Sequence, residues 1–278
     1  SAQFERVLVL HDTKNFFTFV DVDEEPVPSL LRGFSAPVAL VDGLDDAALI
    51  VLLRHDADAF NRWEAGQRMM LARLLDALRS DSMPTLDAPL EGALRTVLRD
   101  PQLDPAFKAI ALRLPDEDYI AEQLAVFDPP RTRAARDALR RQLAEALRDD
   151  WAWAWEAHPV HGGYTPDAAS AGRRALANLA LAMLCIAGQA SGDDAWPRRA
   201  LERFDRANNM TERLGALIAL TESHSPLAEG ALERMYALAR GDALVLNKWF
   251  ALQATMPERD GTVFARVKQL LRHPDFSL

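Results

Sequence analysis

The chain has 278 residues, of which 49% are hydrophobic and 26% charged, and its net charge is -9. This length allows a substantial buried core in one large domain or in two smaller ones. The negative charge argues against a nucleic-acid or anionic-membrane partner, because such partners select for clustered lysine and arginine. No segment approaches the roughly 20 consecutive apolar residues that cross a bilayer, so no membrane partner is expected.

The first residues predict extended structure. Residues 6–10 and 15–20 are rich in β-branched and aromatic side chains, and Asp12 and Lys14 lie between them as turn formers, which favours a β-hairpin. We expect a third strand at residues 36–41. Two or three strands cannot bury both faces alone, so they are interpreted as the remnant of a small, incomplete β-sheet. We expect residues 6–20 to dock on the first helices or to pair with another copy.

Pro26, Pro28 and Pro37 predict a rigid connector after the hairpin. Proline fixes φ and lacks a backbone donor, so a continuous helix is excluded there. The predicted domains are residues 1–43, the end of a small β-domain with its proline-rich connector, and residues 44–278, a truncated helical C-terminal domain. The start at Ser1 instead of methionine suggests an expressed fragment or a cleaved product.

Helix signals are dense from Asp45 onward. Asp45 is expected to cap the first helix, and a second helix carries Phe60, Trp63 and further apolar residues on one face. On the opposite side of that helix, Glu64 and Arg68 are expected to form an i,i+4 ion pair that contributes about 0.3 kcal/mol.

Polar caps followed by proline predict four more helix starts. They are Asp104-Pro105, Asp128-Pro129, Thr165-Pro166 and Ser225-Pro226. The helix after Asp128 is predicted to be long and regular, because apolar residues recur at every fourth position from Leu139 to Trp155. Roughly ten or eleven helices with short loops are expected, which favours a mainly α fold of stacked antiparallel helical pairs in a solenoid-like superhelix.

Two groups suggest ligand chemistry at first sight. Trp151, Trp153 and Trp155 resemble an aromatic cage, but Trp153 points about 200° away from its neighbours in a helix, so we expect the rings to pack in different places. Cys185 lies in an apolar run without a basic neighbour, so a buried, unreactive thiol is expected.

Four blocks carry a resemblance to a known family. They are residues 25–38 (EPVPSLLRGFSAPV), 60–65 (FNRWEA), 207–211 (ANNMT) and 247–255 (NKWFALQAT). In this order they resemble the C-terminal part of bacterial aminopeptidase N, a zinc metallo-aminopeptidase. The resemblance implies a parent hydrolase that uses one zinc ion to remove N-terminal residues from peptides. It also implies a helical domain that closes over the catalytic domain and limits substrate access.

The chemistry of such an enzyme is not found in this chain. A zinc peptidase of this kind requires His-Glu-x-x-His on a helix, and none of the six histidines begins that pattern. His158 and His161 are the only close pair, and glycines beside them indicate a loop in place of a metal site. Asn209 with Glu212 predicts a helix cap. Asn208 and Met210 are candidates for facing a cavity, but no catalytic, cofactor or metal role is assigned to any residue.

Three functions are compatible with these observations. The first is a non-catalytic fragment of a zinc aminopeptidase, whose partners are the catalytic and β-domains of the parent chain and its peptide substrates. The alternative is a free-standing helical scaffold for protein–protein binding, which the incomplete sheet disfavours. The third, a separate enzyme, lacks a convergent set of acid, base and metal ligands. One cysteine and no signal pattern lead us to expect a cytoplasmic protein.

Overall fold

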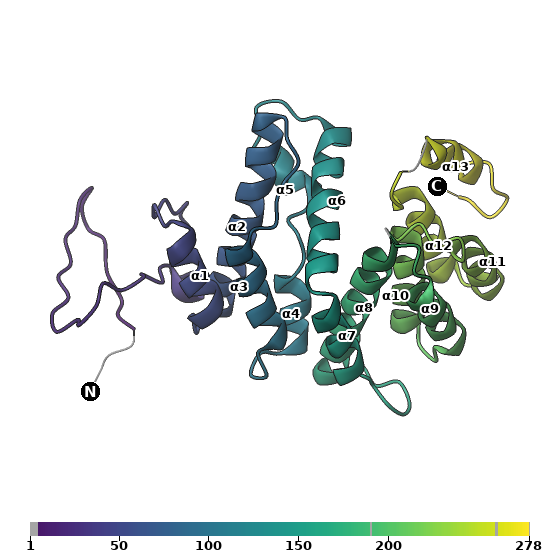
Figure 1. The fold of residues 1–278 in the computed structure, drawn as a ribbon, viewed down its shortest axis with the longest axis horizontal. Coiled ribbons are helices and arrows are strands. Elements are labelled where there is room, and N and C mark those ends of the chain that lie inside the picture. Colours follow the sequence, from purple (N-terminus) through teal and green to yellow (C-terminus); the bar gives the residue numbers. More distant parts are fainter. Residues whose placement is uncertain (1–4, 190, 259–260, 278) are drawn as a thin grey trace.

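The computed structural model describes residues 5–189, 191–258 and 261–277. Within these residues thirteen α-helices follow one 3-10 turn, with the N-terminal helices at one end of the long axis of the molecule and the C-terminal helices at the other (Figure 1). The elements are η1 Arg32–Phe34, α1 Asp46–His55, α2 Ala59–Ser80, α3 Ala88–Arg99, α4 Pro105–Ala111, α5 Glu117–Glu122, α6 Pro129–Ala146, α7 Arg148–Ala157, α8 Ala168–Gln189, α9 Ala195–Arg206, α10 Met210–Glu222, α11 Ala228–Ala239, α12 Ala243–Thr255 and α13 Thr262–Leu270. The predicted mainly α architecture is confirmed.

Polar side chains immediately before the first residue of most helices explain where these helices begin. Each accepts a hydrogen bond from a backbone N–H that the helix itself leaves unpaired. The capping residues are Asp45, Asp58, Asp87, Asp104, Asp116, Asp128, Asn209 and Asp242. The caps predicted at Asp45, Asp104, Asp128 and Asn209 are therefore confirmed.

The central helix α8 joins two hydrophobic clusters. One of its faces packs with the buried residues of α1 to α7, and the other packs with those of α9 to α13. By length and composition α8 could cross a membrane, but 72% of its apolar window is buried inside the protein. It is therefore the core helix around which the two halves of the stack are assembled.

The long helix predicted after Asp128 is divided into α6 and α7. Leu147, with φ -106° and ψ 24°, lies at the junction and ends the regular α-helix. The apolar stripe survives the break, because Leu139, Leu143, Leu147 and Trp151 are all buried. This break and the short helices α5 and α13 explain why thirteen helices form where fewer were expected.

Two predicted helix starts are displaced along the chain. Asp167, and not Thr165, accepts the hydrogen bond from Ser170 N at the beginning of α8. Ser225 begins a turn whose hydroxyl accepts from Leu227 N, and α11 starts only at Ala228. In both cases the helix begins two residues after the proline, so the proline lies in the approach to the helix.

The predicted β-strands do not form among the described residues. Residues 6–10, 15–20 and 36–41 share no backbone ladder, and residues 36–38 form a tight turn in which Val38 N donates to the Ala36 carbonyl at 3.0 Å. The chain does reverse between Asp12 and Asn15, and the Arg6 guanidinium lies 6.0 Å from the Phe19 ring centroid. The segment extends away from the helices (Figure 1), so docking on the first helices is not observed, and pairing with another copy stays a prediction. A physical reason is that an isolated two-stranded hairpin buries little and is marginal in water.

Candidate functional site

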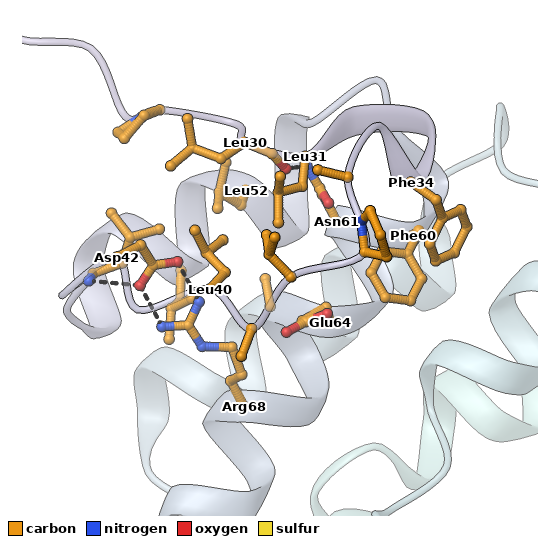
Figure 2. Close-up of a pocket in the computed structure, with 18 residues that line it drawn as sticks. Leu30, Leu31, Phe34, Leu40, Asp42, Leu52, Phe60, Asn61, Glu64 and Arg68 are labelled. Atoms are coloured by element: carbon orange, nitrogen blue, oxygen red, sulfur yellow. Dashed lines mark hydrogen bonds and ion pairs between the residues drawn. The ribbon is translucent and has the colours of Figure 1, made fainter. Parts of the chain in front are cut away.

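The proline-rich connector is anchored to the beginning of the helical stack (Figure 2). The Asn61 side chain on α2 donates hydrogen bonds of 2.9 Å to the Ser29 hydroxyl and to the Leu30 carbonyl. The Arg32 guanidinium donates to Asp56 at 2.6 Å. Since the two bonds of Asn61 join residues about 30 positions apart, they fix the connector against the helical stack.

A second anchor replaces an ion pair that the sequence predicts. Arg68 donates to both carboxylate oxygens of Asp42, at 2.7 and 2.8 Å (Figure 2), so the expected pair of Arg68 with Glu64 is wrong. The Asp42 side chain is only 5% exposed, and a bidentate contact to a buried carboxylate is stronger than a surface pair within one helix. Hydrogen bonding from Arg68 holds the pKa of Asp42 below its usual value.

The connector and helices α1 and α2 enclose a mostly apolar hollow of about 440 Å3. At one side of it, the Phe34 and Phe60 rings lie with their centroids 4.4 Å apart (Figure 2). Phe60 in turn contacts Trp63, at 5.6 Å between centroids. The first turns of α2 therefore link the connector to a second, larger hollow that Trp63 lines.

That second hollow, which we call the groove, has a volume of about 890 Å3. It runs past α2, the turn between α4 and α5, α6, α8, α10 and α12, so it involves both halves of the stack. Its lining includes Trp63, Gln67, Arg113, Arg136, Arg140, Asn178, Met183, Met210, Thr211, Glu222 and Lys248. The arrangement is that of an extended surface able to contact a chain-like ligand.

The groove is locally basic although the whole chain is acidic. Four basic and two acidic side chains line it. Arg140 on α6 forms an ion pair with Glu222 on α10, which connects two walls of the groove. Burial, followed by the charge of Arg140, lowers the pKa of the Arg136 guanidinium. Arg136 Nε donates to the Pro115 carbonyl at 2.7 Å.

The two cavity candidates named from sequence separate in the structure. Met210, at the first turn of α10, lines the groove. Asn208 does not line it, and instead donates to the Gly162 carbonyl at 3.2 Å. Sequence reasoning missed Arg136, Arg140 and Glu222. The available signal was the spacing of Arg133, Arg136 and Arg140, which places three guanidinium groups on one face of α6.

His158 and His161 do not converge on a common ligand, and His158 makes contacts with α7. His158 Nδ1 lies 2.8 Å from the Ala154 carbonyl at the end of α7, and its ring packs edge-on against Trp153. Burial lowers the pKa of His158, while His161 is exposed in the following loop. Among the described residues, no group of three His, Cys, Asp or Glu side chains is placed to hold a metal ion.

The tryptophans and the cysteine occupy the structural positions expected of them. Trp151 is fully buried, Trp153 lies 4.4 Å from the Arg99 guanidinium, and Trp155 packs against Trp196. The three rings therefore contact different neighbours and do not form a cage. Burial raises the pKa of the Cys185 thiol to about 12.

Three of the four sequence blocks that carry the family resemblance meet at the groove. Trp63 comes from residues 60–65, Met210 and Thr211 from residues 207–211, and Lys248 from residues 247–255. The fourth block, residues 25–38, forms most of the connector that α2 holds beside the groove. The resemblance thus describes one continuous region of the folded molecule.

Comparison with known proteins supports this resemblance. Residues 46–278 match the family model described as a domain of unknown function (DUF3458_C) with ARM repeats, and residues 1–43 match one described as a domain of unknown function (DUF3458) with an Ig-like fold. Aminopeptidase N of Caulobacter vibrioides is 37% identical over 97% of this chain and 31% of its own length. Aminopeptidase N of Escherichia coli is 33% identical over 98% of this chain and 31% of its own.

A solved structure shows the same fold. Legionella pneumophila aminopeptidase A, in complex with aspartic acid, superposes with a TM-score of 0.80 at 28% identity, over 94% of this chain and 31% of that one. The predicted resemblance to aminopeptidase N is confirmed. The chain spans about 31% of the length of the relatives it matches.

Proposed function

Because the chain belongs to the DUF3458_C family of ARM-repeat domains, we propose that it is the helical C-terminal part of a zinc aminopeptidase. In this proposal residues 44–278 enclose the active site and limit access to it, and residues 1–43 end a neighbouring β-domain. The parent removes N-terminal residues from peptides in the cytoplasm. The observation that carries the proposal is the similarity to aminopeptidase N along almost the whole chain.

The zinc ion that this proposal implies does not fit the residues of this chain. The described residues hold no group of three metal-binding side chains, and the sequence contains no His-Glu-x-x-His. The ion and the hydrolytic chemistry therefore belong to the other part of the parent. The role of this chain is to hold the connector and to present the groove to a peptide.

Activity and metal content test the proposal directly. The full-length gene product should hydrolyse an alanyl anilide and contain zinc, whereas this chain with added zinc should do neither. Turnover by this chain alone, or an upstream sequence without His-Glu-x-x-His, would contradict the proposal.

A groove variant tests the role in substrate access. In the full-length protein, Met210→Trp should reduce kcat/KM for a tetrapeptide more than for the small anilide, because the added ring narrows the groove. Leu238→Trp, at an exposed position of α11, is the matched control. Equal effects on both substrates would show that the groove does not meet the peptide.

A further inference from the structure

Three arginines on one face of α6 have unequal partners. Arg133 pairs with Glu117 at 2.7 Å and with Asp137 at 3.4 Å, and Arg140 pairs with Glu222. Between them, Arg136 has no carboxylate within ion-pair distance among the described residues. The three arginines and these three carboxylates sum to no net charge, but Arg136 has no ion pair of its own, and it lines the groove.

The surroundings of Arg136 make the positive charge of its guanidinium energetically unfavourable. The side chain is half-buried, and the guanidinium groups of Arg133 and Arg140 on the same helix repel it. Glu117 and Asp137 attract it, but both bind Arg133 directly. A partly desolvated cation without a paired anion favours binding of an anion from outside.

The hydrogen bond that Arg136 makes to the Pro115 carbonyl leaves the N–H donors of its two terminal nitrogens available to a ligand. Its Nε is occupied by the Pro115 carbonyl at 2.7 Å, which fixes the plane of the group. The two terminal nitrogens remain, and a pair of parallel N–H donors matches the two oxygens of a carboxylate. Arg140 lies one helical turn from Arg136 and is kept in place by its ion pair with Glu222, which offsets its charge.

We propose that Arg136 binds a carboxylate of the peptide that occupies the groove. This inference rests on the proposed function, since it takes the ligand to be a peptide. The carboxylate belongs either to the C-terminal residue of the peptide or to an acidic side chain, because both present the same group to a guanidinium. Arg136 is thus a specificity-determining residue outside the catalytic portion of the parent.

Calorimetric titration of the 278-residue chain with three short peptides tests the proposal. The probes are penta-alanine with a free C-terminus, penta-alanine amide, and the amide of Ala-Ala-Glu-Ala-Ala. At least one carboxylate-bearing peptide should bind about tenfold more tightly than penta-alanine amide, which corresponds to about 1.4 kcal/mol. Preference for the free acid identifies the C-terminus as the source, and preference for the glutamyl peptide identifies a side chain.

Variants assign the effect to one residue. Arg136→Gln should abolish the difference in affinity between the peptides. Arg136→Lys should retain part of it, because lysine keeps the positive charge but lacks the two parallel N–H donors of a guanidinium. Arg79→Gln, at an exposed position of α2, should leave the difference intact, and circular dichroism confirms that each variant is folded.

The outcomes separate this inference from the proposed function. Equal binding of all three peptides, or an unchanged difference in folded Arg136→Gln, overturns the carboxylate site alone. Absence of binding by every peptide overturns the site and also the role of the groove in substrate access.

Discussion

At the scale of single residues, Cys185 shows how burial decides reactivity. The side chain lies on the buried part of α8 and is 1% exposed, and burial raises its pKa to about 12. The thiolate, which is the reactive form, is therefore scarce at physiological pH. The native protein should not react with a thiol reagent at pH 8, and one thiol per chain should react in urea. Stoichiometric labelling of the folded protein within minutes would contradict this.

Asp42 should make stability depend on pH. Its carboxylate is stabilised first by the hydrogen bond from Arg68 and also by the Leu44 N–H, so its pKa is lower in the folded chain than in the unfolded one. Such a group stabilises the fold above the unfolded pKa of about 3.9, and this stability is lost as the pH falls toward the folded pKa. Asp42→Asn should cost about 1–3 kcal/mol at pH 7.

Thermal unfolding of Asp42→Asn at several pH values measures this contribution. The difference from wild type should shrink below about pH 4, because Asp42 of the unfolded wild-type chain then takes up a proton while the folded chain resists protonation until lower pH. Asp23→Asn, at an exposed position of the N-terminal segment, is the control and should unfold as wild type does. A difference that stays constant with pH would mean that the Asp42 charge is not involved.

At the scale of elements, α8 and α10 approach each other closely at Gly215. A Cβ atom there would overlap the side-chain amide of Asn178 on α8. That amide donates to the Thr211 carbonyl at 3.0 Å and accepts from Arg203 at 3.3 Å, so it ties α8, α9 and α10 together at the groove. Gly215→Ala should therefore destabilise the protein by about 1–3 kcal/mol through overpacking.

Chemical denaturation of Gly215→Ala and of a matched variant measures this effect. A Cβ at Gly230 in α11 meets nothing within 4 Å, so Gly230→Ala should be neutral or should stabilise the helix by up to about 1 kcal/mol. If both variants had the same stability as wild type, the close approach of α8 and α10 would be refuted.

At the scale of elements, neighbouring residues predict where helices begin but not where a long helix breaks. Asp45, Asp104, Asp128 and Asn209 cap helices as predicted, because a cap depends only on residues within one turn. The break at Leu147 could not be predicted, since the apolar stripe continues through it and the packing of α7 against α8 decides the change of direction.

At the scale of the whole molecule, the N-terminal segment and the helical stack should differ in resistance to protease. Residues 5–24 are almost all exposed and extend away from the stack. Trypsin should therefore cut first after Arg6 or Lys14, and mass spectrometry should find a long-lived product that retains the anchored connector and the helices. A first cut inside α2 to α10 would show that the stack is less stable than the segment.

Most of the groove was beyond the reach of sequence reasoning. Met210 was named as a cavity candidate, but Arg140 and Glu222 are 82 positions apart and meet only when α6 and α10 are stacked. The same holds for Arg68, whose nearest acid along the helix is Glu64 but whose partner is Asp42 on the connector. In each case the ion-pair partner of the arginine is the carboxylate that the fold places next to it.

The amino-acid sequence alone determined the helical class, most helix starts, the buried state of Cys185 and the resemblance to aminopeptidase N. These depend on neighbours within one helical turn or on patterns preserved along the chain. Tertiary structure alone decided that residues 6–20 form no sheet, that α6 and α7 separate, and that Trp63, Arg136, Met210 and Lys248 line one groove. The physical reason is that burial and charge pairing act between segments distant in sequence, so only the packed chain assigns their partners.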